Sequence, residues 1–267
     1  MNKPNKINFA GNSSSSRDVA FHMHPYTNPA QLEATGPHII NRGNGVFVHD
    51  DSGNRFYEGM SGLWCTSLGF SEPELVNAAI AQFNKLPFYH SFAGKTVDPA
   101  IELAEILIAN APPAGGSSHM SKVFFAASGS EANDTAMKMV WYYNAALGRP
   151  EKRKIISRKK GYHGVTMAAA SMTALAYAQD GFGLPLDFVK HTVAPDYYNE
   201  AQNGESEEEF SNRCAAELEE LILTEGPDTV AALFAEPVMG AGGVIIPPTG
   251  YFAKIRAVLE KSSRHDR

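Results

Sequence analysis

The segment Lys122–Trp141 joins a short apolar run to a small polar turn and a long helical pattern, and it restricts the fold more than any other stretch. Residues Val123–Ala127 are β-branched, aromatic or small, which is typical of a short buried strand. Ser128 and Glu131 have the spacing of a capping box, in which the hydroxyl accepts from an early helical amide and the carboxylate accepts from the Ser128 amide. A helix that mostly faces inward is then expected over Ala132–Leu147, which contains no proline or glycine.

The turn between this strand and this helix is suited to binding an anion. Amides at the N-terminal end of a helix have no helical partners and lie at its positive end. Gly129 would let a phosphate approach the backbone, and the hydroxyl of Ser128 or Ser130 can donate to it. An ordinary capped helix explains the pattern equally well. The turn does not have the residues of a Walker loop, a dinucleotide-binding turn or a nucleophile elbow.

Composition and charge exclude some classes of partner. The 267 residues, 43% of them apolar, suffice for one large or two modest domains with a substantial core. A net charge of −6 without a basic stripe argues against nucleic acid, and the short basic groups at Lys152–Lys154 and Arg158–Lys160 are expected to be solvated. No apolar run is long enough for a membrane span, and two cysteines do not make a disulfide framework. We therefore expect a cytoplasmic protein without nucleic-acid or membrane partners.

The N-terminal stretch is expected to hold little regular structure. Residues 1–20 are polar and predict a flexible arm. His22 and His24 lie close together but lack further ligands in the sequence, so we predict no metal site. Farther along, the strand-like residues Val46–Val48 and Arg55–Tyr57 flank a Gly/Asp turn, which predicts a hairpin.

Helices and strands alternate through the rest of the chain. Helices are predicted first at Pro73–Lys85 and Pro99–Asn110. After the central helix we predict, in order, a strand at Ile155–Ser157, a helix at Gly164–Ala178, a strand at Val189–Val193, a helix at Ser206–Glu225, a strand at Val230–Phe234 and a helix at Tyr251–Lys261. This alternation is typical of an α/β fold with a mostly parallel sheet and flanking helices. Ligands bind beyond the carboxyl ends of such strands, where loops 128–130, 161–164 and 236–243 are expected to meet.

Three stretches at these strand ends are specific when taken together. They are Phe124–Asp134 (FFAASGSEAND), Lys160–Met167 (KGYHGVTM) and Ala235–Tyr251 (AEPVMGAGGVIIPPTGY). With them the sequence resembles the class III pyridoxal-phosphate aminotransferases, most closely the amine–pyruvate or omega transaminases. Met60–Thr96 also resembles that subgroup, so the resemblance covers about residues 21–261.

The resemblance implies a pyridoxal-phosphate-dependent transferase of fold type I with an incomplete large domain. Residues 1–20 would be the flexible arm, 21–72 the N-terminal segment of the small domain and 73–267 the large, cofactor-binding domain. The C-terminal domain of the family would be absent. Family members are homodimers with the active site at the subunit boundary, which implies a homodimer for the intact protein.

The same resemblance implies a set of residues for pyridoxal 5'-phosphate. The cofactor-binding positions are Ser128, Gly129, Ser130, Tyr162, His163 and Glu236. Gly129 and Ser130 match residues that hold the phosphate, and Tyr162 matches the aromatic that stacks on the pyridine ring. His163 is expected to be structural, and Glu236 to lie close to the cofactor. The alternatives are a rim aromatic at Tyr162 and a solvated acid at Glu236.

Four residues are implied for the substrate: Trp64, Phe92, Tyr162 and Ala241. Trp64 and Phe92 match aromatic positions that line the amine pocket, with core packing as the alternative for both. At the position of Ala241, relatives that use 2-oxoglutarate often carry a glutamate that pairs with an arginine. Because an alanine cannot make that pair, the resemblance favours pyruvate as the acceptor and an amine or omega-amino acid as the donor.

The reaction also needs a lysine that forms a Schiff base and an acid opposite the pyridine nitrogen. In the family both follow the helix that ends here at Lys261. Asp266 lies in a polar run that does not match, and Lys160 belongs to a basic run before the ring-stacking residue. We therefore expect no catalytic residue in this chain, which resembles the front part of a truncated or frameshifted transaminase, and poor solubility from exposed apolar surface.

Two alternatives to a transaminase remain open. The first is an aminomutase or a decarboxylase that keeps the fold and the cofactor but changes the reaction. The second is a non-catalytic protein that binds the cofactor or modulates a dimer. Both alternatives use the same loops, so the sequence pattern does not separate them from the leading interpretation.

Overall fold

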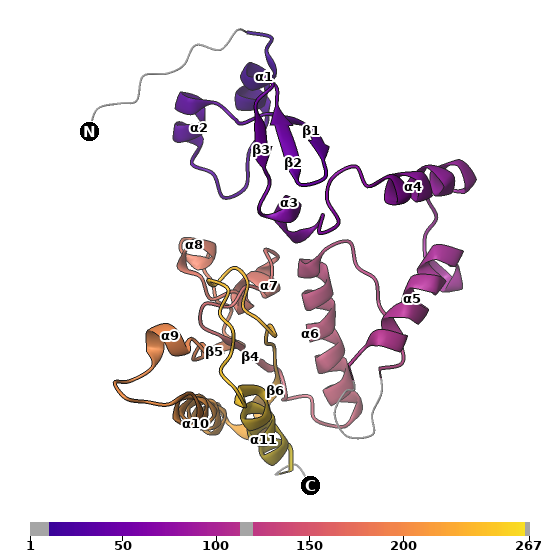
Figure 1. The fold of residues 1–267 in the computed structure, drawn as a ribbon. Coiled ribbons are helices and arrows are strands. Elements are labelled where there is room, and N and C mark those ends of the chain that lie inside the picture. Colours follow the sequence, from indigo (N-terminus) through magenta and orange to yellow (C-terminus); the bar gives the residue numbers. More distant parts are fainter. Residues whose placement is uncertain (1–10, 113–119, 265–267) are drawn as a thin grey trace. The chain divides into compact units, whose positions relative to one another are not determined.

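The computed structural model describes residues 11–112 and 120–264. The chain divides into two compact units, Met1–Ile106 and Leu107–Arg267. Figure 1 labels the helices and strands of both units. Among the described residues, no helix is both long and apolar enough to cross a membrane.

The first unit begins with two helices and an antiparallel sheet. Its first elements are α1 (Ser14–Phe21), α2 (Pro29–Thr35), β1 (Ile40–Asn44), β2 (Phe47–Asp50) and β3 (Arg55–Tyr57). The sheet has the order β1-β2-β3, and the predicted hairpin is present as β2 and β3. The sequence pattern did not predict β1, because its residues are mostly polar. Gly43 in this strand leaves room for the ring of Phe70, which lies 2.7 Å from where a Cβ would be.

Helix α1 begins within residues 1–20, the stretch that was expected to be a flexible arm. The hydroxyl of Ser13 accepts a hydrogen bond from the amide of Ser16 at 3.1 Å and caps this helix. Residues 1–10 of the expected arm lie outside the described residues. Regular structure therefore begins nearer to the N-terminus than the sequence pattern predicted.

The first unit continues with three helices and one 3-10 helix, the last of which leads into the second unit. They are α3 (Ser61–Trp64), α4 (Pro73–Lys85), η1 (Phe92–Gly94) and α5 (Asp98–Asn110). The predicted bounds of α4 are confirmed, and α5 begins one residue earlier than predicted. Pro73 occupies the first turn of α4, where its missing N–H costs nothing. The apolar side chains of both helices, such as Ile80 and Phe83, are exposed.

The second unit contains a three-stranded parallel sheet. Its strands are β4 (Lys154–Arg158), β5 (Val189–Thr192) and β6 (Val230–Leu233), in the order β5-β4-β6. Its helices are α6 (Gly129–Ala146), α7 (Met167–Met172), α8 (Ala176–Gln179), α9 (Tyr197–Glu200), α10 (Glu207–Glu225), η2 (Pro227–Thr229) and α11 (Tyr251–Arg264). The three predicted strands are confirmed within one residue at each end, and the parallel α/β sheet is the predicted fold class.

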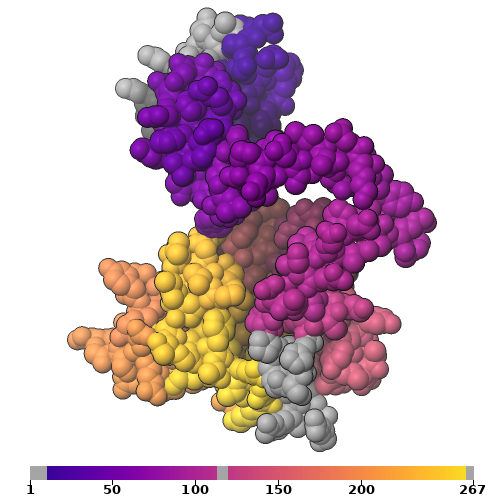
Figure 2. Space-filling model, turned by 45° about the vertical axis from the view of Figure 1, so that its right-hand side comes forward, coloured from indigo at the N-terminus to yellow at the C-terminus, as the bar shows by residue number. Residues whose placement is uncertain are grey.

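The two faces of the central strand β4 hold separate cores. Ile156 packs with α10 and α11, in a cluster that includes Phe210, Leu218 and Tyr251. Its neighbour Ile155 points to the other face, where it packs with residues of α6, α7 and β5. Both isoleucines are fully buried because helices cover both faces of a parallel sheet. The side-by-side arrangement of α10 and α11 is visible in Figure 1, and Figure 2 shows the yellow C-terminal residues beside the orange ones.

The prediction of a buried strand at Val123–Ala127 is wrong. These residues form no strand, and Phe124 exposes 62% of its surface. A strand requires a neighbouring backbone for its N–H and C=O groups, and none of the described residues pairs with this run. The following helix α6 also faces inward less than expected, since Met137 is buried but Tyr142 and Tyr143 are exposed.

The single helix predicted at Gly164–Ala178 is also wrong. Two short helices, α7 and α8, replace it, and the chain is extended at Thr173 between them. The Thr173 hydroxyl accepts from the amide of His163 at 2.8 Å and lies 3.2 Å from the carbonyl oxygens of Gly164 and Ala169. The bonds with His163 and Gly164, which belong to the preceding loop, compete with continuation of the helix, and the periodicity of the sequence does not indicate them.

Leu218 in α10 tests the larger core directly. Replacement Leu218→Ala is expected to lower the free energy of unfolding by about 2–5 kcal/mol, because the side chain is fully buried and leaves a cavity. Leu223→Ala in the same helix, where the side chain is 61% exposed, should cost less than about 0.5 kcal/mol. Urea unfolding followed by circular dichroism measures both, and equal losses would contradict the assigned core.

Candidate functional site

Three loops of the second unit meet beyond the carboxyl ends of its strands. The Ser130 hydroxyl accepts from the Val165 amide at 3.0 Å, and the Asn133 side-chain amide donates to the His163 carbonyl at 2.7 Å. The amide of Tyr162 donates to the Glu236 carboxylate at 3.0 Å. The loops at 128–130, 161–164 and 236–243 are therefore in contact, which is the arrangement that an α/β sheet uses for ligand binding.

The turn before α6 presents unpaired amides. The Ser128 hydroxyl accepts from the Glu131 amide at 3.2 Å, as predicted, but the Glu131 carboxylate accepts from the amide of Ala127 at 2.9 Å and not from that of Ser128. Among the described residues, the amides of Ser128, Gly129 and Ser130 have no hydrogen-bond partner. Three donors thus lie together at the positive end of a helix of 18 residues.

The surroundings of these amides can accept a phosphate. Nothing lies within 4 Å of the position that a Cβ on Gly129 would take, so the backbone is open to a ligand. The hydroxyls of Ser128 and Ser130 each accept a bond from an amide and keep their own proton for donation. Free amides, open space and two hydroxyl donors together match the chemistry of a phosphate dianion.

Two glycines allow the loops to approach this closely. Gly164 has φ +134°, and a Cβ there would lie 2.5 Å from the Ser130 hydroxyl oxygen. A Cβ on Gly242 would overlap the carbonyl oxygen of Lys160. Neither position can carry a side chain without moving the loop against which it packs.

Glu236 joins the second loop to the third. One carboxylate oxygen accepts from the Tyr162 amide at 3.0 Å and the other accepts from the Gly240 amide at 3.1 Å. The carboxylate is half-buried and is not the solvated acid considered as the alternative. The Glu236 carboxylate thus holds the backbone at Tyr162 in place.

Arg158 supports the third loop through a hydrogen bond to the Glu236 backbone, and the sequence analysis did not predict this role. Its side chain is fully buried, and it donates from Nη2 to the Glu236 carbonyl at 2.5 Å beside the rings of Tyr251 and Phe252. The expectation that this basic group is solvated is therefore wrong for Arg158, and also for Lys152, which is buried. The burial of Arg158 could have been predicted from the alternation of side chains along β4, because alternate residues share a face and Arg158 lies two positions after the buried Ile156.

His163 is buried behind the tyrosine. Its backbone amide donates to the Thr173 hydroxyl at 2.8 Å, and its ring Nε2 has no partner among the described residues. Burial lowers the pKa of His163, with the nearby Glu236 charge opposing this effect, and burial also lowers the pKa of His191. The contacts of His163 are those of a residue that supports the loop in its neutral form.

Lys160 lies next to the site but is held by two acids. Its ammonium group lies 2.7 Å from the Asp196 carboxylate and 2.8 Å from that of Glu200. The hydrogen bond with Asp196, followed by that with Glu200, raises the pKa of Lys160. A lysine that attacks a carbonyl needs a neutral amine, so these contacts agree with the expectation that Lys160 is not the Schiff-base residue.

Ala241 lies at the tip of the third loop. Backbone hydrogen bonds of 3.0 Å between Met239 and Ile245 close this loop in both directions. Ala241 is exposed at the turn and offers only a methyl group. No acidic side chain is present at this tip to pair with an arginine.

Trp64 and Phe92 belong to the first unit, and neither is buried in its core. Trp64 ends α3, whose residues Ser61–Trp64 all have φ between 50° and 65°, in the left-handed region. The Glu58 carboxylate stabilises this unusual turn by accepting from the amides of Met60 at 3.2 Å and Gly62 at 2.7 Å. Left-handed backbone at residues other than glycine is unfavourable, so contacts of this kind are needed to keep it.

The fold is that of a pyridoxal-phosphate-dependent transferase of fold type I. A family model described as aminotransferase class-III matches residues 30–264. The chain belongs to the class III aminotransferases.

Curated relatives and solved structures agree with this family. "Probable gamma-aminobutyrate transaminase 2, mitochondrial" from Oryza sativa subsp. indica is 55% identical over 225 residues, which are 84% of this chain and 44% of the relative. "Gamma aminobutyrate transaminase 2" from Solanum lycopersicum is 52% identical, over 89% of this chain and 51% of the relative. The omega transaminase from Pseudomonas jessenii in complex with PMP is 53% identical with a TM-score of 0.91, over 94% of this chain and 54% of the other. The chain spans about half the length of the relatives that it matches.

Burial of His163 predicts a stability that depends on pH. The folded-state pKa lies below the ordinary histidine value of about 6.5, so the unfolded state binds more protons and stability falls as the pH drops below that value. His163→Phe, which does not titrate, is expected to reduce this loss between about pH 7 and pH 5. Urea unfolding at several pH values measures the difference, and an identical decline in the variant would contradict the assignment.

Proposed function

We propose that this polypeptide forms the phosphate-binding and ring-binding part of the active site of a transaminase that uses pyridoxal phosphate. The reaction moves an amino group from an amine or an omega-amino acid to a keto acid, with pyruvate favoured. The observation that carries the proposal is the row of amides at Ser128–Ser130, which have no hydrogen-bond partner among the described residues and lie in contact with the loop that bears Tyr162.

The residues present fit the cofactor. The amides of Ser128–Ser130 and the two serine hydroxyls would bind the phosphate, and Tyr162 would cover one face of the pyridine ring. Glu236 would fix the position of Tyr162 through its amide, and His163 would fill the space behind it. When bound, pyridoxal phosphate supplies a ring that withdraws electrons from the substrate carbon. The contribution of this chain is to orient that ring and to keep water from one of its faces.

The relatives support the proposed substrates. Two of them are named gamma-aminobutyrate transaminases, and an omega-amino acid is a donor of the proposed kind. A solved structure at 52% identity and a TM-score of 0.88, over 95% of this chain and 56% of the other, is described as a transaminase with L-ala, and alanine is the product when pyruvate accepts the amino group. Ala241 also supports pyruvate as the acceptor. An alanine at the loop tip has no carboxylate that could pair with an arginine, the pair found in relatives that use a dicarboxylic acceptor.

A homodimeric intact protein is part of the proposal. Large apolar side chains are exposed on α4 and α6, including Phe83, Met139 and Tyr143, and they need a cover from other chain segments or from a second copy. A cytoplasmic location, for which the two unpaired cysteines are the support, is also proposed. The rice relative is named as mitochondrial, so fractionation of cells is the direct test of this point.

Phosphate recognition at Gly129 can be measured without catalysis. Gly129→Ala is expected to weaken binding of pyridoxamine 5'-phosphate about tenfold or more, because a methyl group occupies the open space over the amides, a loss on the order of 1.4 kcal/mol. This ligand lacks an aldehyde and does not react with surface lysines. Isothermal titration calorimetry gives the affinities, and pyridoxamine without phosphate should bind equally to both proteins.

Two glycine controls separate binding from folding. Gly11→Ala, also at an open position, should change neither affinity nor stability, whereas Gly164→Ala should lower stability because its Cβ would meet Ser130. Equal affinity of the wild type and Gly129→Ala for the phosphorylated ligand, or no binding by the wild type, would refute the proposed phosphate site.

The 267-residue polypeptide by itself is proposed not to catalyse transamination, since the lysine beside its site is held in ion pairs. Incubation with pyridoxal phosphate, an amine and pyruvate is expected to form alanine no faster than a blank. Formation well above the blank that is lost in Lys160→Met would instead identify Lys160 as the reacting lysine. Formation that survives this substitution would also contradict the prediction and would point to another group.

A further inference from the structure

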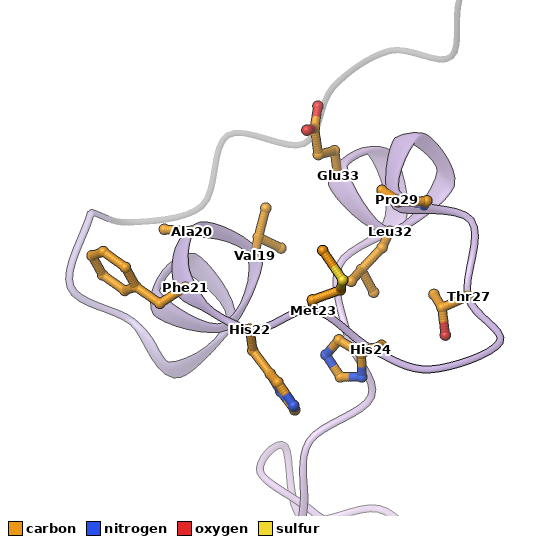
Figure 3. A pocket seen from close by; sticks show the side chains of 10 residues that line it. All are labelled: Val19, Ala20, Phe21, His22, Met23, His24, Thr27, Pro29, Leu32 and Glu33. Carbon is orange, nitrogen blue, oxygen red and sulfur yellow. The ribbon is translucent and has the colours of Figure 1, made fainter. Parts of the chain in front are cut away.

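A cluster outside the proposed cofactor site brings two histidines and an acid together at the end of α1. Asp18 lies 3.0 Å from Nδ1 of His22 through one carboxylate oxygen and 2.7 Å from Nε2 of His24 through the other. One oxygen or nitrogen atom from each of the three residues lies within 4.8 Å of the others. Figure 3 shows the two imidazole rings on the same side of the segment that links α1 to α2.

The local backbone produces this convergence. Asp18 and His22 are separated by four positions and therefore share one face of α1. His22 ends the helix in an extended conformation, with φ −112° and ψ 122°. Extended residues two positions apart point to the same side, so His24 returns to the side of His22. The carboxylate is thus placed between the two rings by backbone geometry.

The cluster is partly protected from solvent. The side chain of Asp18 is 16% exposed and that of His24 is 27% exposed, whereas His22 is 60% exposed. Both histidines line a cavity of about 280 Å³ together with Val19, Met23 and Leu32. Apart from the histidines, the cavity is lined mostly by apolar residues, with Thr27 and Glu33 as polar members, and the side at His22 is open to ions from solution.

Two imidazole nitrogens and a carboxylate oxygen form a donor set that suits divalent transition metals, zinc in particular. Without a metal, each ring donates an N–H to the carboxylate. A dication would take the place of these two protons, and each neutral ring would then carry its proton on its other nitrogen. The ion would lie about 2.0–2.1 Å from each ligand, which sets the ligands roughly 3.3 Å apart. The observed separations of 3.0 and 2.7 Å, which run to the two different oxygens of Asp18, need to open by well under 1 Å, and the ligand atoms of all three residues already lie within 4.8 Å of one another.

We propose that Asp18, His22 and His24 bind a divalent transition metal ion of the Zn²⁺ class, with solvent in the fourth position. The ion links the last turn of α1 to the segment that follows it and fixes the direction in which the chain leaves the helix. The sequence signal is the spacing D-x-x-x-H-x-H, in which the acid was not recognised as the third ligand. This site does not depend on the proposed transaminase function.

The experiment uses the full chain without an affinity tag, treated with chelator and then titrated with Zn²⁺ in a calorimeter. We expect one equivalent to bind, with affinity at least tenfold weaker in Asp18→Asn and in His24→Gln. His38→Gln is the matched control, because His38 also faces an acid, Asp50 at 3.5 Å, but has no third ligand among the described residues. Cys65→Ser is the second control, because Cys65 is an exposed thiol that can bind zinc by itself. Both controls should bind as the wild type does.

X-ray absorption of the zinc-loaded wild type identifies the ligands without any substitution. Two imidazole nitrogens with oxygen and no sulfur are expected. A sulfur ligand, affinity in Asp18→Asn equal to that of the wild type, or no zinc binding by the wild type would each overturn the proposal.

Discussion

The arrangement of the site depends on one carboxylate that accepts two backbone amides from different loops. Glu236 holds the amide of Tyr162, 74 positions earlier in the chain, and the amide of Gly240 within its own loop. Bonds of this kind to a charged group each contribute about 1.5–3 kcal/mol. The buried Arg158 donates to the backbone carbonyl of Glu236. Arg158 thus fixes the backbone of Glu236, while the Glu236 carboxylate fixes the backbones of Tyr162 and Gly240.

The free amides of the first loop result from which backbone amide the Glu131 carboxylate binds. The Glu131 carboxylate turns to the amide of Ala127, one residue farther back than a standard capping box requires. The amides of Ser128, Gly129 and Ser130 therefore form a group of three donors that have no partner in the described part of the chain. The Ser130 hydroxyl meanwhile binds the Val165 amide, so the free donors and the loop of Tyr162 are held in contact.

The exposed apolar surfaces have a common physical cause. Helical periodicity in α4 and α6 indicates which side chains form an apolar stripe, but it carries no information about what covers the stripe. The run Val123–Ala127 has the composition of a strand, yet a strand forms only when another backbone satisfies its polar groups. This chain of 267 residues matches about half the length of its relatives. In the described part of the chain, no neighbouring strand pairs with the backbone N–H and C=O groups of Val123–Ala127.

The sequence by itself determined the elements whose signals are local. Pro73 predicted the start of α4, Ser206 with Glu209 as a capping box predicted the start of α10, and the alternation of apolar strands with helices predicted a parallel α/β sheet. Only the tertiary structure decided the burial of Arg158, the break of the helix at Thr173 and the position of Asp18 between two histidines. Caps and periodicity depend on residues a few positions apart, whereas these contacts depend on chain segments or ring orientations that only the folded backbone brings together.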